Sequence, residues 1–221
     1  MRFLIREQEY ETPLAAGRFQ YTRNGLATGA SESWRLSEIA DGYRFLRVDM
    51  DTRETNIDES TLYHLLLDPN GRPERLKLRI LAIGKQLQCD IIFEKSSIMA
   101  SGGAERGRFE NELELESSYG FYFPTAIGYA LLLRYALEQG EISAVTFDQA
   151  RTSLLNQKSV IISAQAEEVL KVVRQKIVTH SYLIRWADQG NQIWLDDYQW
   201  PLKIDFGNGQ VANETQYIRY Y

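Results

Sequence analysis

The sequence is poor in the residues from which most catalytic and metal sites are built. Its 221 residues include one cysteine, Cys89, and two histidines, His64 and His180. A single cysteine excludes an intrachain disulfide and a metal cage of several thiolates. Each histidine stands alone, without the HxH or HExxH spacing of a metal site. We interpret both as ordinary strand residues and expect no metal, no cofactor and no catalytic residue.

Long apolar runs and nucleotide-binding signatures are also missing. No segment approaches the roughly 18 apolar residues of a membrane-spanning helix, and the N-terminal MRFLIREQEYE lacks the apolar core of a signal peptide. Neither a GxSxG elbow nor a GxxxxGK[ST] loop occurs. The net charge is -5, whereas nucleic-acid binding needs a surplus of Lys and Arg. We therefore expect a soluble, cytoplasmic protein with no transmembrane segment and no nucleic-acid partner.

What the sequence does have is a strong alternation of apolar and polar residues. It runs through residues 18–22, 45–51, 75–80, 87–94 and 109–116, with turn signals such as Asn-Gly and Asp-Gly between the runs. Period-two alternation is typical of antiparallel strands with one buried and one solvated face. With no linker to divide it, the chain is expected to form a single domain over residues 1–221 of the α+β class, mainly β.

One segment departs from this rhythm and predicts a helix near residues 124–139. Pro124 suits the first turn of a helix and Gly140 the position just after its end. The residues between are mostly apolar, which predicts a helix buried against the sheet. Residues 164–175 are ambiguous between helix and strand, and the strand-rich neighbours favour strands.

Charged residues also alternate along the predicted strands. An acidic series occupies one strand face and a basic series another: Glu110, Glu112, Glu114 and Glu116, and Arg75, Lys77 and Arg79. Such series normally form solvated faces, and contact of the basic series with an anionic head group is a weaker hypothesis. Cys89 lies on the apolar face of its alternating strand together with Leu87 and Ile91, which predicts a buried, unreactive thiol.

Aromatic residues supply the candidate site. A cluster precedes the predicted helix, and further aromatic residues lie on predicted strands. They form either the packed core or the wall of an apolar groove between a curved sheet and its helix. Under the second interpretation the ligand-binding residues are Trp34, Phe45, Tyr63, Tyr119, Phe121, Tyr122, Phe123, Trp186 and Trp194.

Two distant stretches share a pattern of Leu-Asp, four residues and Pro. They are LDPNGRP at 67–73 and LDDYQWP at 195–201. Pro, Asn and Gly in the first are turn residues, and the aspartates of the second can cap a turn through their side chains. We interpret both as hairpin turns and not as a duplicated active site.

A family resemblance rests on a series of segments along most of the chain: SESWRL, IADGYRFLRVDMD, LYHLLLDPNGRPERLKLRI, YGFYFPTAIGYALLLR and IWLDDYQWPLKIDFGNGQVANETQYIR. The series resembles bacterial glycolipid-binding proteins and related uncharacterised families whose half-barrel is similar to the lipoprotein-localisation factors. The resemblance implies a strongly curved antiparallel sheet (a half-barrel) wrapped around one or two helices, with an apolar concavity for acyl chains. It carries over Trp34, Asp68, Arg72, Pro124, Asp196 and Pro201, most of them as turn-shaping residues.

Three functions follow as hypotheses. The leading one is a non-enzymatic binding protein for a lipid-like or amphipathic ligand held in an apolar groove. The first alternative is a hydrolase of a glycan or lipid that uses carboxylates such as Asp49, Asp51 or Glu112. The second is a protein-interaction or homodimeric structural protein that uses an exposed sheet edge.

Overall fold

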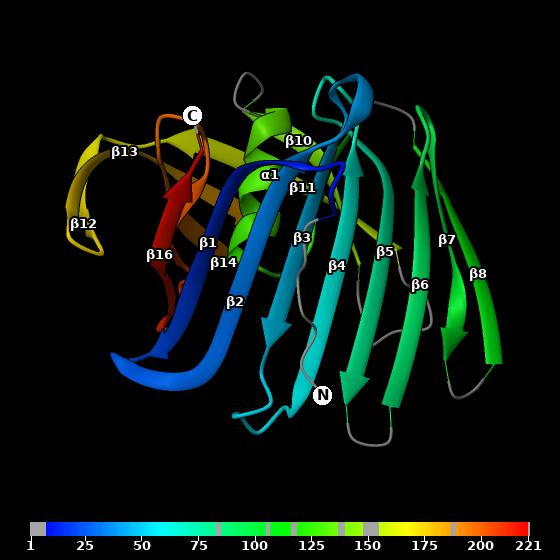
Figure 1. Ribbon diagram of the computed structural model, residues 1–221, viewed down its shortest axis with the longest axis horizontal. Helices are drawn as coiled ribbons and strands as arrows, with labels where there is room; N and C mark the ends of the chain where they lie inside the picture. The colour runs from blue at the N-terminus through cyan, green and yellow to red at the C-terminus, as the bar shows by residue number, and fades with distance from the viewer. Residues whose placement is uncertain are drawn as a thin grey trace. The chain divides into compact units, whose positions relative to one another are not determined.

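A computed structural model describes residues 8–82, 85–104, 107–115, 119–136, 140–147, 155–186 and 189–220. These residues form mainly β-strands, with the helix α1 (Ala126–Ala136) and the short 3-10 helix η1 (Ala40–Gly42) (Figure 1). The strands are β1 (Thr12–Arg23), β2 (Leu26–Glu38), β3 (Arg44–Asp51), β4 (Glu59–Leu67), β5 (Pro73–Ala82), β6 (Lys85–Phe93), β7 (Ser97–Ala104), β8 (Gly107–Glu114), β9 (Tyr119–Tyr122), β10 (Glu141–Phe147), β11 (Leu155–Ala164), β12 (Glu168–Val172), β13 (Gln175–Trp186), β14 (Gln189–Leu195), β15 (Pro201–Asp205) and β16 (Gln210–Arg219). The mainly β class expected from the sequence is confirmed.

The chain folds into two compact units. Unit 1 consists of Met1–Arg18, Gly29–Glu116 and Ile218–Tyr221, and unit 2 of Phe19–Thr28 and Ser117–Tyr217. The hairpin of β1 and β2 contributes residues to both. It turns at Asn24 and Gly25, which both have positive φ, of 51° and 80°, as the Asn-Gly signal of a tight hairpin predicts.

Unit 1 is an antiparallel meander in the order β8-β7-β6-β5-β4-β3-β2. Its register places Trp34, Val48, Tyr63, Leu78 and Cys89 side by side across five neighbouring strands, and all five are buried. The opposite face carries the polar residues of the alternation. Burial of one face therefore fixes the register of the meander, because a slip by one residue would expose the apolar series.

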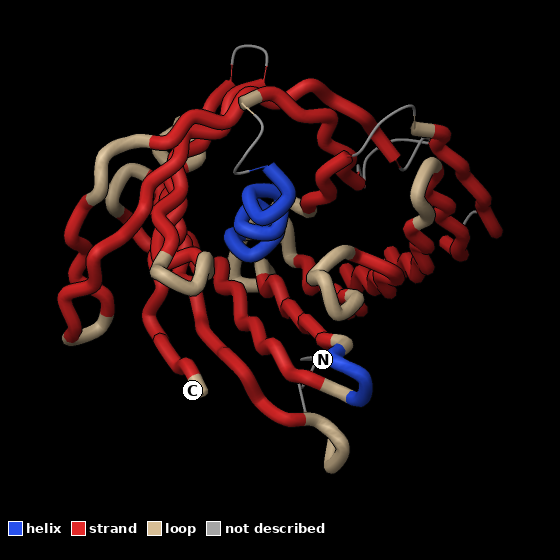
Figure 2. The backbone as a smooth tube through the Cα atoms, turned by 90° about the horizontal axis from the view of Figure 1, so that it is seen from above, coloured by secondary structure: helices blue, strands red, loops and turns tan. Residues whose placement is uncertain are grey.

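Unit 2 contains the order β16-β15-β14-β13-β11-β10-β9, with β12 paired to β13 alone. Helix α1 contacts β9 and β10 near one end of this order and β14 and β15 near the other. Figure 2 shows α1 within the curve of these strands. The pairing of β9 with β10 is parallel, whereas the pairs from β10 through β11, β13, β14 and β15 to β16 are antiparallel.

Helix α1 lies inside the predicted range 124–139, of which residues 137–139 lie outside the described residues. Pro124 precedes the helix, and Thr125 caps it by accepting the backbone N–H of Gly128 at 3.1 Å. Gly128 packs so closely on the preceding turn that a Cβ there would lie 2.0 Å from the carbonyl oxygen of Phe123. The tight entry therefore requires glycine at this position.

The ambiguous residues 164–175 form strand β12 with the connections on either side of it. They run from the end of β11 through β12 to the start of β13, so the strand interpretation is confirmed. Their helix propensity is overridden because Val169, Leu170 and Val172 pair with residues of β13 in antiparallel register.

Candidate functional site

Five aromatic rings meet beside α1 in unit 2. This aromatic cluster consists of Tyr21, Tyr122, Tyr129, Trp186 and Phe206. Tyr129 and Trp186 stack at 5.8 Å between ring centroids with an interplanar angle of 7°. Tyr122 lies 5.2 Å from Tyr129 and 6.3 Å from Trp186. Phe206 extends the group, 5.9 Å from Tyr129 and 6.0 Å from Tyr21.

The cluster is assembled from five separate elements. Tyr21 lies on β1, Tyr122 ends β9, Tyr129 lies on α1 and Trp186 ends β13. Phe206 directly follows β15, where its backbone N–H donates to the carbonyl of Gln210 in the turn. Contacts between rings at 5–6 Å add to the stabilisation that their buried area provides.

The polar atoms of the cluster have partners within the protein. The Tyr122 hydroxyl is hydrogen-bonded to Thr146, and the Tyr129 hydroxyl to Asn191. The Trp186 indole N–H donates to the Gln189 side chain at 3.1 Å. Because these groups are satisfied, the rings can offer apolar surface without leaving a buried donor or acceptor unpaired.

Burial differs across the cluster and determines its charge. Tyr122 and Tyr129 are buried, whereas Trp186 and Phe206 are partly exposed. Burial raises the pKa of both tyrosine hydroxyls above the ordinary value of 10.0 because an ionised phenolate is poorly solvated there. The cluster is thus uncharged at neutral pH, with two partly exposed rings backed by buried ones.

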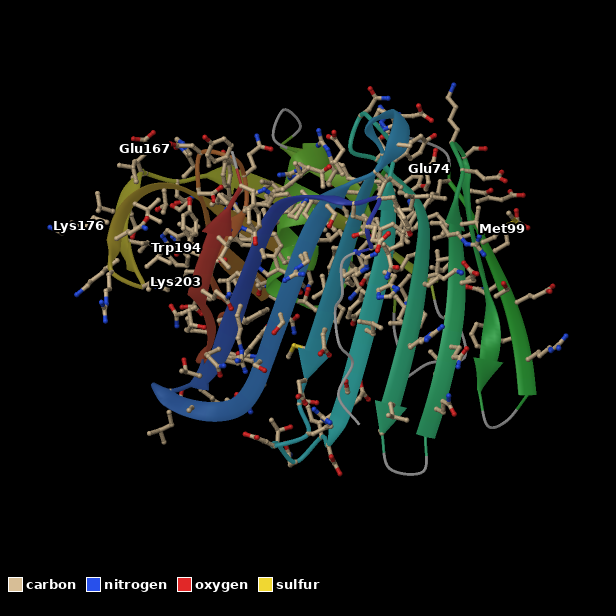
Figure 3. All side chains as sticks on the ribbon, viewed as in Figure 1. Glu74, Met99, Glu167, Lys176, Trp194 and Lys203 are labelled. Carbon is tan, nitrogen blue, oxygen red and sulfur yellow. The ribbon has the colours of Figure 1, made fainter. Side chains whose placement is uncertain are left out.

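Of the ligand-binding residues predicted from sequence, Tyr122 and Trp186 belong to the aromatic cluster. Trp186 pairs with Gln189 across β13 and β14, and Gln189 is five residues from Trp194. An odd separation places Trp194 on the opposite face of the sheet. There Lys203 lies 4.1 Å above the Trp194 ring. Figure 3 labels both residues.

The other predicted residues take separate places. Phe121 and Phe123 are buried and pack together at 6.3 Å, and Tyr119 is partly buried at the start of β9. In unit 1, Trp34 and Tyr63 are part of the buried apolar face. Phe45 lies on the other face of that sheet, 4.5 Å below the Arg47 guanidinium.

Sequence reasoning missed Tyr21, Tyr129 and Phe206 as members of this group. They come from a strand, a helix and a turn that are distant in sequence, so no periodicity connects them. The available signal was local: Tyr21 belongs to the alternating run at 18–22, which shows that its ring is buried but not which rings it meets.

The thiol and imidazole groups considered as catalytic candidates lie outside the aromatic cluster, since Cys89 and His64 are on strands of unit 1. Cys89 is buried, as the alternation predicts, and burial raises the pKa of its thiol to about 12, which disfavours the nucleophilic thiolate. Burial, together with the charges of Arg47, Arg79 and Lys77, lowers the pKa of His64 to about 4. Among the described residues, no group of three His, Cys, Asp or Glu side chains could hold a metal ion.

The three carboxylates proposed for hydrolysis lie in different environments. Asp49 is buried and accepts a hydrogen bond from Ser60 at 3.4 Å. Asp51 binds the guanidinium of Arg53 at 2.6 Å. Glu112 is exposed on β8.

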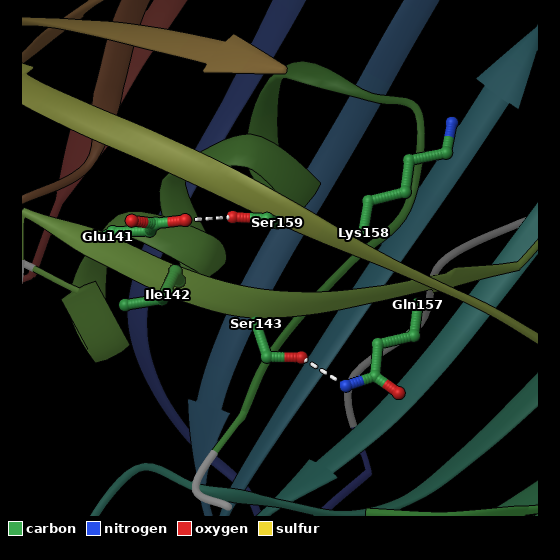
Figure 4. Close-up of a pocket in the computed structure, with 6 residues that line it drawn as sticks. All are labelled: Glu141, Ile142, Ser143, Gln157, Lys158 and Ser159. Atoms are coloured by element: carbon green, nitrogen blue, oxygen red, sulfur yellow. Dashed lines mark hydrogen bonds between the residues drawn. The ribbon is translucent and has the colours of Figure 1, made fainter. Parts of the chain in front are cut away.

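A shallow depression of about 450 Å³ crosses β10 and β11 (Figure 4). Its lining is mostly polar: Glu141, Ile142, Ser143, Gln157, Lys158 and Ser159. The Ser159 hydroxyl donates to Glu141 at 2.5 Å and the Gln157 amide to Ser143 at 2.6 Å. These two contacts join β10 to β11 across the depression.

Two solved structures are similar to this chain over most of its length. One is a beta-barrel-like protein of the domain of unknown function DUF1849 from Brucella abortus, with 14% identity, a TM-score of 0.54, and coverage of 95% of this chain and 98% of that chain. Another is a DUF1089 family protein from Pseudomonas aeruginosa, with 10% identity, a TM-score of 0.47 and the same coverage. No family model matches the sequence, and no curated protein matches it. The first likeness shows a shared fold.

None of the helical segments in the described ranges is long and apolar enough to cross a membrane.

Proposed function

We propose that this chain is a non-enzymatic binding protein whose aromatic cluster holds a lipid-like or amphipathic ligand. The observation that carries the proposal is the geometry of Trp186. Its indole is partly exposed and is stacked at 7° on the buried ring of Tyr129. A fixed, partly exposed aromatic face is suited to an acyl chain or to the apolar face of a sugar.

The energetics of the cluster favour binding over chemistry. Leaving apolar ring surface in water costs about 25 cal/mol per Å², and a ligand that covers Trp186 and Phe206 would recover that free energy. The surrounding hydroxyl, amide and indole groups are already hydrogen-bonded. They orient the rings and could exchange partners with a polar head group.

The resemblance to glycolipid-binding half-barrels supports the same ligand class. Within this proposal the half-barrel, the single domain, the cytoplasmic location and the remaining predicted ligand-binding residues stay predictions. A homodimer remains the alternative to a monomeric carrier.

Fluorescence quenching by a brominated fatty acid tests the site. Bromine quenches indole only at close range, so we expect saturable quenching of the wild-type protein. Trp186→Phe should lose the quenchable fraction, whereas Trp194→Phe, on the opposite sheet face, should keep it. Equal quenching of wild type and Trp186→Phe would place the ligand elsewhere.

Organic extraction of the purified protein, followed by mass spectrometry, tests the ligand class. We expect a co-purified amphiphile in stoichiometric amount from wild type and less from Trp186→Ala. A clean extract together with no quenching by the fatty acid would overturn the proposal.

A further inference from the structure

Strand β12 and the first half of β13 form a two-stranded ribbon that extends from the sheet of unit 2. Residues 175–179 of β13 pair with β12, whereas residues 180–186 pair with β14. Within the described ranges, no further strand pairs with β12, and Figure 1 shows β12 at the edge of this unit. An isolated two-stranded ribbon is marginal in water, so its surface chemistry is informative.

One face of the ribbon is apolar and exposed. Val169 and Val178 are directly opposed in the register and are 62% and 49% exposed. Val173, in the turn, is 54% exposed. Apolar β-branched side chains on a strand are normally covered by a core or by a partner, and here they are exposed.

The same face is basic toward the turn. Lys171 and Lys176 are also directly opposed, although like charges in such pairs are destabilising. Arg174 lies between them in the turn. Residues 168–178 hold these three cations and one carboxylate, Glu168, in a chain whose net charge is -5. Figure 3 labels Lys176 near the turn and Glu167 at the base.

The turn itself is strained in a way that presents an apolar side chain. Val173 has φ of 56°, in a two-residue hairpin turn between Val172 and Gln175. Positive φ at this position normally belongs to glycine, and for a β-branched residue it is an outlier. The tip therefore combines exposed apolar side chains, a pair of directly opposed lysines and a valine with positive φ. Departures of this kind from the usual preferences concentrate at functional surfaces.

We propose that this ribbon tip is a docking element for an anionic lipid bilayer, a function beyond ligand binding at the aromatic cluster. Lys171, Arg174 and Lys176 would approach lipid phosphates while Val173 and the Val169–Val178 pair enter the interfacial region. Charge complementarity selects this partner. Pairing of this edge with a second copy is disfavoured, because lysines on an edge strand hinder the pairing of further strands. The lysines of one copy would also lie beside those of the other.

Docking at the tip is independent of the aromatic cluster. Trp186 ends the strand that begins at Gln175, so about 36 Å of strand separates the two sites along β13. Vesicle binding and fatty-acid quenching therefore report different surfaces, and failure of one leaves the other intact.

Vesicle flotation of the full chain tests the proposal. We expect the protein to float with vesicles of phosphatidylcholine and phosphatidylglycerol, to be released by high salt, and not to float with phosphatidylcholine alone. Neutralising three interfacial cations in Lys171→Gln/Arg174→Gln/Lys176→Gln should weaken partitioning roughly a hundredfold. The matched control Arg72→Gln/Lys95→Gln/Arg108→Gln removes three exposed cations from unit 1 and should leave partitioning unchanged.

A second variant separates docking from folding. Val173→Gly suits the positive φ and should not lower stability, yet loss of the isopropyl group should weaken partitioning about fivefold. The proposal is overturned by equal binding to both vesicle types, by no binding, or by equal weakening in the control. Dimerisation in light scattering that the ribbon triple variant abolishes, without vesicle binding, would assign the tip to a second copy. Binding to polyglutamate alone would assign it to an acidic protein.

Discussion

Asp68 and Asp196 make the same three hydrogen bonds in two hairpin loops. In the first loop the Asp68 N–H donates to the carbonyl of Arg72, and the Asp68 carbonyl accepts from Gly71. The Asp68 carboxylate accepts the Arg72 N–H at 2.7 Å. Asp196 bonds in the same way with Trp200 and Gln199, its carboxylate accepting the Trp200 N–H at 2.8 Å.

The shared loop also has a shared register. Beside each of the two loops the register of the paired strands shifts. After the shift, Leu67 pairs with Pro73 in one hairpin and Leu195 pairs with Pro201 in the other. The repeated Leu-Asp and Pro pattern thus encodes one loop geometry used twice, because each aspartate caps its own loop. The turn interpretation is confirmed for both stretches.

Removing the two carboxylates should have unequal effects. Asp196 is 2% exposed and also accepts the Tyr198 N–H at 3.0 Å, so Asp196→Ala leaves two donors without their acceptor. We expect Asp196→Ala to lower the free energy of unfolding by about 2–3 kcal/mol and Asp68→Ala, whose loop reaches water, by about 1 kcal/mol. Urea denaturation followed by circular dichroism measures both. Asp197→Ala, at an exposed neighbour, should change it by less than about 0.5 kcal/mol, and equal losses at 68 and 196 would contradict the assignment.

The third loop position carries glycine in one copy and glutamine in the other. Gly71 has φ of 81° and Gln199 has φ of 64°. Because Gln199 is exposed, Gln199→Gly should relieve backbone strain at little cost and raise the free energy of unfolding by about 1 kcal/mol. Gly71→Gln should lower it by a similar amount, since a Cβ there meets no atom within 4 Å and only the backbone is affected. Thermal and urea unfolding of the two reciprocal variants provide the check, and a stabilised Gly71→Gln would be the contrary result.

Local patterns in the sequence predicted the strands but not the contacts between them. Alternation identified the buried side of Cys89 and the exposed side of the Glu110 series because strand faces depend only on parity. Which aromatic rings are in contact depends on how neighbouring strands are paired, and the sequence does not show this pairing. Trp186 and Trp194 were therefore both predicted to bind the ligand, although they lie on opposite faces of the sheet. The ribbon was ambiguous because Val173 and Arg174 are not turn-forming residues. The helix begins at Ala126, after the Thr125 cap, and not at Pro124.

A buried ion pair joins the segment before β1 to β3. Arg47 contacts Glu11 through two hydrogen bonds, one of them 2.7 Å long, and the two side chains are 8% and 0% exposed. Burial alone would raise the pKa of Glu11, but the hydrogen bond to Arg47 and the positive charge of Arg47 lower it overall. The carboxylate is therefore ionised at neutral pH.

Breaking this pair should be costly from either side. Arg47→Met leaves a buried carboxylate without its partner, and we expect the free energy of unfolding to fall by about 3–4 kcal/mol. The double variant Glu11→Gln/Arg47→Met should be less destabilised than the sum of its single variants. The partly exposed pair Arg53–Asp51 provides the matched control, where Arg53→Met should cost less than about 1 kcal/mol. Additive losses in a urea-denaturation cycle would show that Glu11 and Arg47 are not coupled.

His64 should make stability fall between pH 7 and pH 5. Its pKa in the folded protein is about 4, below the ordinary value of 6.5, so the unfolded chain binds a proton in this window and the folded chain does not. Uptake by the unfolded state stabilises it, and after allowance for partial exposure we expect a loss of about 1–2 kcal/mol. His64→Gln should remove this part of the pH dependence, while His180→Gln, at the other histidine, should retain it. Urea midpoints at pH 7 and pH 5 measure the difference, and a His64 imidazole that titrates near 6.5 by NMR would refute the expected burial effect.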